Sequence, residues 1–135
     1  MNDPRAFLES YRYAFERFDV DDILRHFAYP GLVVADAGAV RLVPIVKADW
    51  KKNVAGLIDA YRAIGVKQIR VVKCEVRELS PLIAMAEVEW SLRREDGSVI
   101  YDFHNVYVLG RVDGDLKICS AVSPDENLKL RAAVR

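Results

Sequence analysis

The sequence predicts an α+β fold, with helices packed on one face of a curved antiparallel sheet. Two observations carry this prediction. Residues 86–122 alternate apolar and polar side chains along three strands joined by Asp-Gly turns, at Asp96-Gly97 and Asp113-Gly114. The helical patterns are collected in the part of the chain before these strands, which is typical of α+β proteins. Long, twisted strands are expected to curl the sheet around the helices that cover it.

Two amphipathic helices are expected in the first half of the chain, one at its beginning and one at its end. Asn2 or Asp3 can cap the first helix, and Pro4 suits its first turn. Aromatic residues then recur at helical spacing: Phe7, Tyr11, Phe15 and Phe18. The longest apolar stripe contains Trp50, Val54, Leu57, Ile58, Tyr61 and Ile64. Gly65 follows this stripe directly and is expected to end that helix.

Between these helices the sequence predicts a short helix and a hairpin. Asp19 or Asp21 caps the short helix, whose apolar side includes Phe27, and a Tyr-Pro-Gly sequence ends it. Residues 32–35 and 39–43 are β-rich and are expected to pair with each other and to lie beside the last strand. A further strand is expected at residues 68–79, where polar and apolar side chains alternate.

Carrying the alternation across the turns assigns each side chain to one face of the sheet. The apolar inner face is predicted to contain Ala86, Val88, Trp90, Leu92, Tyr101, Phe103, Asn105, Tyr107, Leu109, Ile118, Ser120 and Val122. The outer face is predicted to contain Glu87, Glu89, Asp102, His104 and Val106, together with Ile69, Val71 and Ala121. A face that mixes charged and apolar residues without helices over it is a candidate interface between two copies of the chain.

Eight residues are predicted to line the interior between the helices and the sheet: Tyr11, Trp50, Cys74, Trp90, Phe103, Asn105, Tyr107 and Ser120. Asn105 stands among aromatic side chains, and a buried amide needs hydrogen-bond partners. Because an amide both donates and accepts, Asn105 is the expected polar anchor for a ligand. The pattern therefore favours a pocket over a solid core.

Composition narrows the classes of partner. The chain has 135 residues and a formal net charge of +0, so nothing attracts nucleic acid or anionic lipid. The apolar runs are too short to span a membrane, and no targeting segment is apparent. Cys74 and Cys119 are too few for a disulfide framework, which predicts a cytoplasmic protein. No spacing of His, Cys, Asp or Glu suggests a metal site, and no glycine-rich loop suggests a cofactor.

Three segments resemble parts of the nuclear transport factor 2-like (NTF2-like) superfamily. FDVDDILRHFAYPG (18–31) is similar to the connection from the first helix to the first strand, and YRAIG (61–65) to the end of the third helix. DGSVIYDFHNVYVLGRVDGDLKI (96–118) is similar to the last two hairpins of many small, uncharacterised bacterial members. The resemblance runs nearly end to end and implies one domain, 1–135, with about six strands in a cone-shaped mixed sheet over three helices. It also implies a homodimer through the outer sheet face.

This superfamily includes ketosteroid isomerase, limonene epoxide hydrolase, scytalone dehydratase and SnoaL-type cyclases, and also members that only bind, so the fold alone selects no reaction. Ketosteroid isomerase activity is not expected. The position of its helical tyrosine is Ala14, and the penultimate strand offers Asn105 and Tyr107 instead of an inner carboxyl group. Asp36 falls where its general base would lie, but within a predicted turn. Limonene epoxide hydrolase needs a carboxylate pair that the predicted inner face lacks.

The predicted function is therefore the binding of a small apolar or aromatic molecule. Two alternatives stay open: a SnoaL-like cyclase, isomerase or lyase acting by proton transfer, and an interaction module with a filled core. Proton transfer would use Tyr107, Asn105, Tyr11, or His26 if that side chain turns inward. His104 is expected outside, opposite Glu89. A deep cavity with a titratable group would favour the enzyme, and one with only Asn, Ser and Tyr would favour binding.

Overall fold

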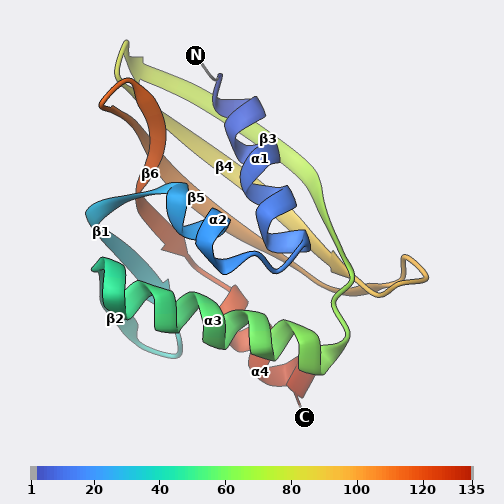
Figure 1. Cartoon of the computed structure of the whole chain (residues 1–135). Coiled ribbons are helices and arrows are strands. Elements are labelled where there is room, and N and C mark those ends of the chain that lie inside the picture. The colour runs from blue at the N-terminus through green and yellow to red at the C-terminus, as the bar shows by residue number, and fades with distance from the viewer. Residues whose placement is uncertain (1–2, 135) are drawn as a thin grey trace.

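A computed structural model describes residues 3–134 and confirms the α+β fold, with a six-stranded mixed sheet and four helices (Figure 1). The elements follow one another as α1 (Pro4–Glu16), α2 (Val20–Arg25), β1 (Phe27–Asp36), β2 (Val40–Ile45), α3 (Lys47–Ile64), β3 (Gln68–Ser80), β4 (Ile83–Arg93), β5 (Val99–Val112), β6 (Asp115–Ser123) and α4 (Glu126–Val134). The first three helices are those predicted, and α4 forms from the charged tail.

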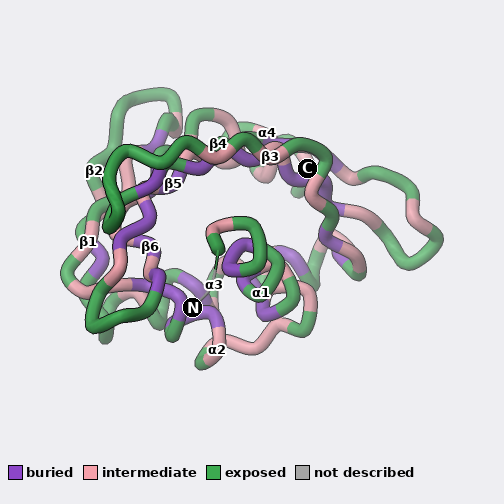
Figure 2. The backbone as a smooth tube through the Cα atoms, turned by 90° about the horizontal axis from the view of Figure 1, so that it is seen from above, coloured by how far each residue is buried: buried purple, intermediate pink, exposed green. Residues whose placement is uncertain are grey.

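The strands are ordered β2-β1-β6-β5-β4-β3 across the sheet. Every neighbouring pair is antiparallel except β1 and β6, which run parallel. The predicted place of the hairpin beside the last strand is thus confirmed. Seen from above, the sheet is an arc whose concave side holds α1, α2 and α3 (Figure 2). The buried residues gather between the arc and these helices.

Local chemistry sets the helix ends. The Asp3 carboxylate accepts hydrogen bonds from the backbone N–H groups of Arg5 and Ala6, so Asp3 is the cap of α1. Asp19 caps α2 by accepting from the backbone N–H of Asp22. Gly65 ends α3 at a φ of 86°, a left-handed conformation that costs glycine little.

Phe27 belongs to a strand rather than to the second helix. α2 ends at Arg25, and β1 begins at Phe27, five residues earlier than the sequence pattern suggested. The Tyr29-Pro30 peptide bond is cis, and Pro30 lies within β1. Phe27 still faces the interior, because it is 5% exposed and packs against Trp50.

Two β-bulges change the faces predicted for β3 and β6. In β3 the pairing shifts between Val71 and Lys73, so Ile69 and Val71 join the inner face and not the outer one. In β6 the pairing shifts at Cys119, which places Ala121 opposite Tyr107 on the inner face. A bulge adds one residue to a strand and therefore exchanges the faces of all residues beyond it.

Ser120 and Val122 lie on the outer face for the same reason. They pair with the outward-facing Val108 and Val106 of β5, and the Ser120 hydroxyl donates to the backbone oxygen of Leu32. Their predicted place on the inner face was therefore wrong. Ala121, which was predicted on the outer face, lies on the inner face in place of Ser120 and Val122.

α4 covers a part of β5 that no strand pairs. The β5–β6 ladder begins only at Val106, which leaves the preceding edge of β5 without a strand neighbour. Asp125, just before α4, accepts a hydrogen bond from the backbone N–H of His104, and the Lys129 ammonium donates to the backbone oxygen of Asp102. These two contacts satisfy backbone groups that a further strand would otherwise pair.

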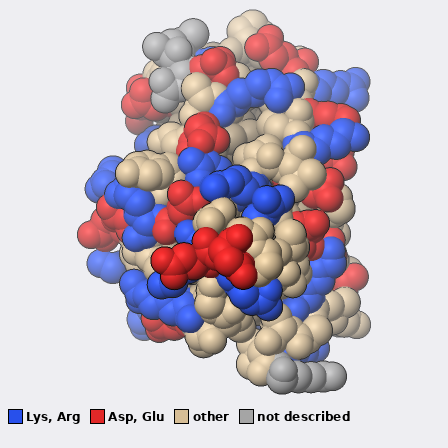
Figure 3. Space-filling model, turned by 90° about the vertical axis from the view of Figure 1, so that its right-hand side faces the viewer, with Lys and Arg blue, Asp and Glu red and all other residues tan. Residues whose placement is uncertain are grey.

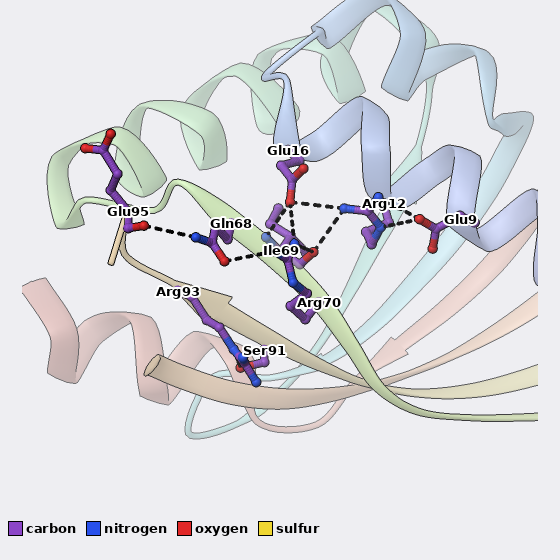
Figure 4. Close-up of polar contacts among 9 residues, drawn as sticks. All are labelled: Glu9, Arg12, Glu16, Gln68, Ile69, Arg70, Ser91, Arg93 and Glu95. Carbon is purple, nitrogen blue, oxygen red and sulfur yellow. Dashed lines mark hydrogen bonds and ion pairs between the residues drawn. The ribbon is translucent and has the colours of Figure 1, made fainter. Parts of the chain in front are cut away.

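Salt bridges and hydrogen bonds tie α1 to the edge strand β3 (Figure 4). Glu16 accepts from the Arg12 guanidinium, from the backbone N–H of Ile69 and from Arg70, while Arg12 also pairs with Glu9. The positive charge of Arg12 is thus balanced by two carboxylates on its own helix. On the face of the molecule shown in Figure 3, acidic and basic side chains are interspersed.

The outer sheet face carries an apolar patch of partly exposed residues at its centre, formed by Met85, Val106, Val108 and Val122. Its neighbours include the Glu89–His104 pair, whose carboxylate and imidazole are 3.8 Å apart. Dimerisation through this face stays a prediction. We expect sedimentation at micromolar concentration to give twice the 15.3 kDa chain mass, whereas a monomer, or a dimer built only from the helices, would contradict it.

Candidate functional site

The concave side of the sheet encloses a cavity of about 490 Å³, which we call the cone cavity. It lies between α1, α3, α4 and the inner faces of the strands. Its aromatic walls comprise Tyr11, Phe15, Phe27, Trp50, Tyr61, Trp90, Phe103 and Tyr107. Three lining residues are exposed and mark the opening between β2 and α3: Arg41, Asn53 and Gly56. A cavity of this size and apolar lining suits one small molecule.

A hydrogen-bonded triad forms the polar floor of the cavity. The Tyr107 hydroxyl accepts from Trp90 Nε1 at 2.9 Å and from Asn105 Nδ2 at 3.0 Å. Both of its acceptor positions are then filled, so its own proton points elsewhere, and no residue within 3–134 accepts it. Burial raises the pKa of Tyr107 above its ordinary value, so the hydroxyl is a neutral donor.

Two buried polar atoms on the cavity wall have no hydrogen-bond partner among the described residues: Trp50 Nε1 and Asn105 Oδ1. The first is a donor on α3 and the second an acceptor on β5. Turning over the Asn105 amide would only exchange the roles, because Oδ1 would then accept from Tyr107 and Nδ2 would be left over. Unpaired buried groups are costly, so a bound molecule that pairs them gains affinity.

Glu126, the first residue of α4, adds a carboxyl group to the cavity lining. Its Oε2 accepts from the hydroxyls of Tyr61, at 2.5 Å, and Tyr101, at 2.8 Å. Glu126 is half-buried as a residue, but its carboxyl group is enclosed. Burial raises the pKa of Glu126 to about 7, against the opposing effect of the two tyrosine hydrogen bonds. The carboxyl group therefore changes charge near neutral pH.

Six of the eight predicted lining residues do line the cone cavity: Tyr11, Trp50, Trp90, Phe103, Asn105 and Tyr107. Cys74 does face inward, opposite Val88 on β4, but it packs beneath the start of α1 instead. Ser120 faces outward, because the bulge at Cys119 turns it away. Tyr11 is the centre of the aromatic wall and contacts the rings of Phe27, Trp90 and Tyr107.

Neither histidine belongs to the cavity lining. His26 is buried between α1 and α2, where Nδ1 donates to the backbone oxygen of Asp22 and Nε2 accepts from the Ser10 hydroxyl. Burial lowers the pKa of His26, so the ring is neutral and structural at neutral pH. His104 lies on the outer face opposite Glu89, as predicted. Asp36 accepts from the backbone N–H of Gly38 in the β1–β2 turn.

Sequence reasoning missed Glu126, the one enclosed carboxyl group of the cavity wall within residues 3–134. It follows the Ser-Pro that ends the sheet, in a tail without an apolar stripe. The signal that existed was indirect. Tyr61 and Tyr101 were both predicted to face inward, and buried tyrosine hydroxyls usually have a hydrogen-bond partner.

Within the described residues, no group of three His, Cys, Asp or Glu side chains could hold a metal ion. Nor is any described helix long and apolar enough to cross a membrane.

The curved sheet, the helices on its concave side and the cavity between them define an NTF2-like protein with a cystatin-like fold. More particularly, the chain belongs to the family of NTF2-like proteins designated DUF6841, whose sequence profile matches residues 2–126. No curated protein is significantly similar to the chain.

Solved structures share the fold at low sequence identity. An NTF2-like protein of unknown function from Pseudomonas putida KT2440 is similar with a TM-score of 0.71 and 11% identity, over 93% of this chain and 87% of that one. One from Shewanella oneidensis MR-1 has a TM-score of 0.67 and 17% identity, over 88% and 93%. A ketosteroid isomerase-like protein from Erwinia carotovora atroseptica has a TM-score of 0.60 and 14% identity, over 89% and 91%. At these identities the likeness establishes the fold and no activity.

Proposed function

We propose that this protein binds a small, mainly apolar or aromatic molecule in the cone cavity. One observation carries the proposal: the cavity of about 490 Å³ is lined by Trp50 and Asn105, whose Nε1 donor and Oδ1 acceptor are buried without partners within residues 3–134. A solid core would have been filled by side chains and would have paired these atoms. The two free cysteines, Cys74 and Cys119, suit the reducing cytoplasm in which we propose that it acts.

The arrangement of polar atoms specifies what the molecule must offer. Aromatic rings supply most of the contact area, which favours a flat or compact apolar body. A hydroxyl or similar group on that body can donate to Asn105 and accept from Trp50 or Tyr107. The simple alcohol 2-methyl-1-phenyl-2-propanol meets these requirements and serves as a neutral probe.

We expect Asn105→Leu to weaken binding of this alcohol by about 1–3 kcal/mol, since its hydroxyl loses the Asn105 acceptor while Leu preserves the volume of the side chain. Quenching of tryptophan fluorescence is the measurement, because both tryptophans, Trp50 and Trp90, line the cavity. Asn53→Leu, at the exposed opening, is the matched control and should change the affinity less than twofold. Equal affinity of the parent and Asn105→Leu would remove Asn105 as the anchor.

A titratable group in the cavity is the feature expected of an enzyme, and Glu126 therefore favours a second candidate, the transfer of a proton within the same cavity. A carboxyl group that titrates near neutral pH is suited to general acid–base catalysis. With a ketone in the cavity, Glu126 would take a proton from the carbon next to the carbonyl group, while Tyr107 donates to the carbonyl oxygen. Incubation of 2-tetralone in D₂O tests this: deuterium incorporation that Glu126→Gln abolishes would establish proton transfer, and none would leave binding alone.

A further inference from the structure

We infer that the natural ligand of the cone cavity is an organic cation, an amine or quaternary ammonium group on an apolar body, with its charge against Glu126. This inference rests on the proposed binding function and specifies the chemical class of the ligand.

The Glu126 carboxylate has no positively charged partner among the described residues. Both hydrogen bonds that Glu126 receives go to Oε2, from the neutral hydroxyls of Tyr61 and Tyr101. Within residues 3–134, no Lys, Arg or His forms an ion pair with either carboxylate oxygen, and Oε1 receives no hydrogen bond from a described residue. A buried carboxylate without a counter-ion is costly, and a cationic ligand would remove that cost.

Two basic residues line the cavity, Arg12 and Arg41, but neither neutralises Glu126. Arg12 is already paired with Glu9 and Glu16 on its own helix, as Figure 4 shows. Arg41 is exposed on β2 at the opening, where solvent and salt screen its charge. Neither arginine therefore cancels the negative charge that Glu126 brings inside.

The remaining groups around Glu126 leave the field in the cavity negative. Tyr61 faces it from α3, Tyr101 and Tyr107 from β5, and Tyr11 from α1, all as neutral hydroxyls. Burial first, and the charge of Glu126 among the further causes, raise the pKa values of Tyr11 and Tyr107, so both hydroxyls stay neutral. Lys129 on α4 forms a salt bridge with Asp125, which lies just before α4 and also pairs with His104.

The aromatic wall of the cavity is also suited to a cation. The faces of tryptophan, tyrosine and phenylalanine rings attract cations, and a cage of such rings beside one carboxylate is suited to an ammonium group. The cone cavity combines both features, since Trp50, Trp90, Tyr11 and Phe103 line it together with Glu126. A neutral apolar ligand would use the rings but would leave the carboxylate buried and unpaired.

The test compares two probes of equal heavy-atom count, benzyltrimethylammonium and the neutral 2-methyl-1-phenyl-2-propanol. A quaternary ammonium keeps its charge at every pH, so any pH dependence of its binding reports the protein. Because the pKa of Glu126 is about 7, we expect the cation to bind about tenfold more tightly at pH 8 than at pH 6, and the alcohol to bind equally at both. At pH 8 the cation should bind at least about tenfold more tightly than the alcohol.

Glu126→Gln should remove both the preference for the cation and its pH dependence, while Glu95→Gln, an exposed carboxylate on the β4–β5 turn, should retain them. If the alcohol binds as tightly as the cation at pH 8, or if the Glu126→Gln protein still prefers the cation, the inference is wrong and the proposed binding function stands. If neither probe binds at millimolar concentration, both are contradicted.

Discussion

Glu126→Gln is expected to stabilise the ligand-free protein by up to about 3 kcal/mol above neutral pH, although it alters a residue of the proposed site. The folded protein raises the pKa of Glu126 from 4.5 to about 7, and each pKa unit corresponds to about 1.4 kcal/mol. Between these two values the folded chain binds more protons than the unfolded chain, so the free energy of unfolding falls as the pH rises. Above about pH 7 the free energy of unfolding has lost this contribution completely. Glutamine does not titrate, so the Glu126→Gln protein does not lose it.

The measurement is the difference in the free energy of unfolding between the parent and Glu126→Gln, from urea titrations at several pH values. This difference isolates Glu126, because His26 and other groups titrate alike in both proteins. It should be small near pH 4, grow between pH 4.5 and 7, and stay constant above. The exposed Glu95→Gln should show no such change, to within about 0.5 kcal/mol. A Glu126→Gln protein less stable than the parent at pH 8 would show that the ionised carboxylate is structural.

Such a result would bear on function, because residues that destabilise the free protein are usually retained for what they bind or do. Tyr61 and Tyr101 can still donate to the amide oxygen of glutamine, so the contacts of α4 are preserved. What glutamine lacks is the charge. A carboxylate that weakens the empty protein is therefore expected to be useful when the cavity is occupied.

The sequence predicted those features whose cause is local. The Asp-Gly turn at Asp96-Gly97 fixes the pairing of β4 and β5, so the predicted juxtaposition of Glu89 with His104 is confirmed. The apolar stripe and Gly65 likewise predicted the end of α3, whereas the helix begins at Lys47, three residues before the first member of the stripe, Trp50. The β4–β5 pairing shifts once beside the turn, between Leu92 and Arg93, but from Leu92 back along β4 the residues keep their predicted partners, so periodicity suffices there.

The errors have causes that no local pattern reveals. A bulge at Val72 or Cys119 adds one residue to a strand, and neither residue type distinguishes a bulge from a regular strand position. Ser120 and Ala121 were consequently exchanged. Glu126 escaped notice because its burial depends on Tyr61 and Tyr101, which are 65 and 25 residues away in the chain. No residue of its helix is buried as a whole, and the tail shows no apolar stripe that would mark an inward face.

Tyr107→Phe is expected to cost about 2–6 kcal/mol of stability, although it removes a single oxygen atom. That oxygen accepts two hydrogen bonds, from Trp90 Nε1 and Asn105 Nδ2, in the interior of the protein. Each donor left unpaired in a buried site costs about 1–3 kcal/mol. Tyr13→Phe is the matched control, because Tyr13 is 52% exposed, and it should change the free energy of unfolding by less than about 0.5 kcal/mol.

The double variant Tyr107→Phe/Asn105→Leu separates the lost hydrogen bonds from any change in packing. It replaces one of the two unpaired donors by an apolar side chain, so it should recover about 1–3 kcal/mol relative to Tyr107→Phe alone. The unpaired Nε1 of Trp90 would then account for the remaining loss of stability. Urea titrations of the four proteins in this cycle give the coupling free energy. A double variant less stable than Tyr107→Phe, or a Tyr107→Phe protein as stable as Tyr13→Phe, would mean that the Tyr107 hydroxyl does not hold the cavity floor together.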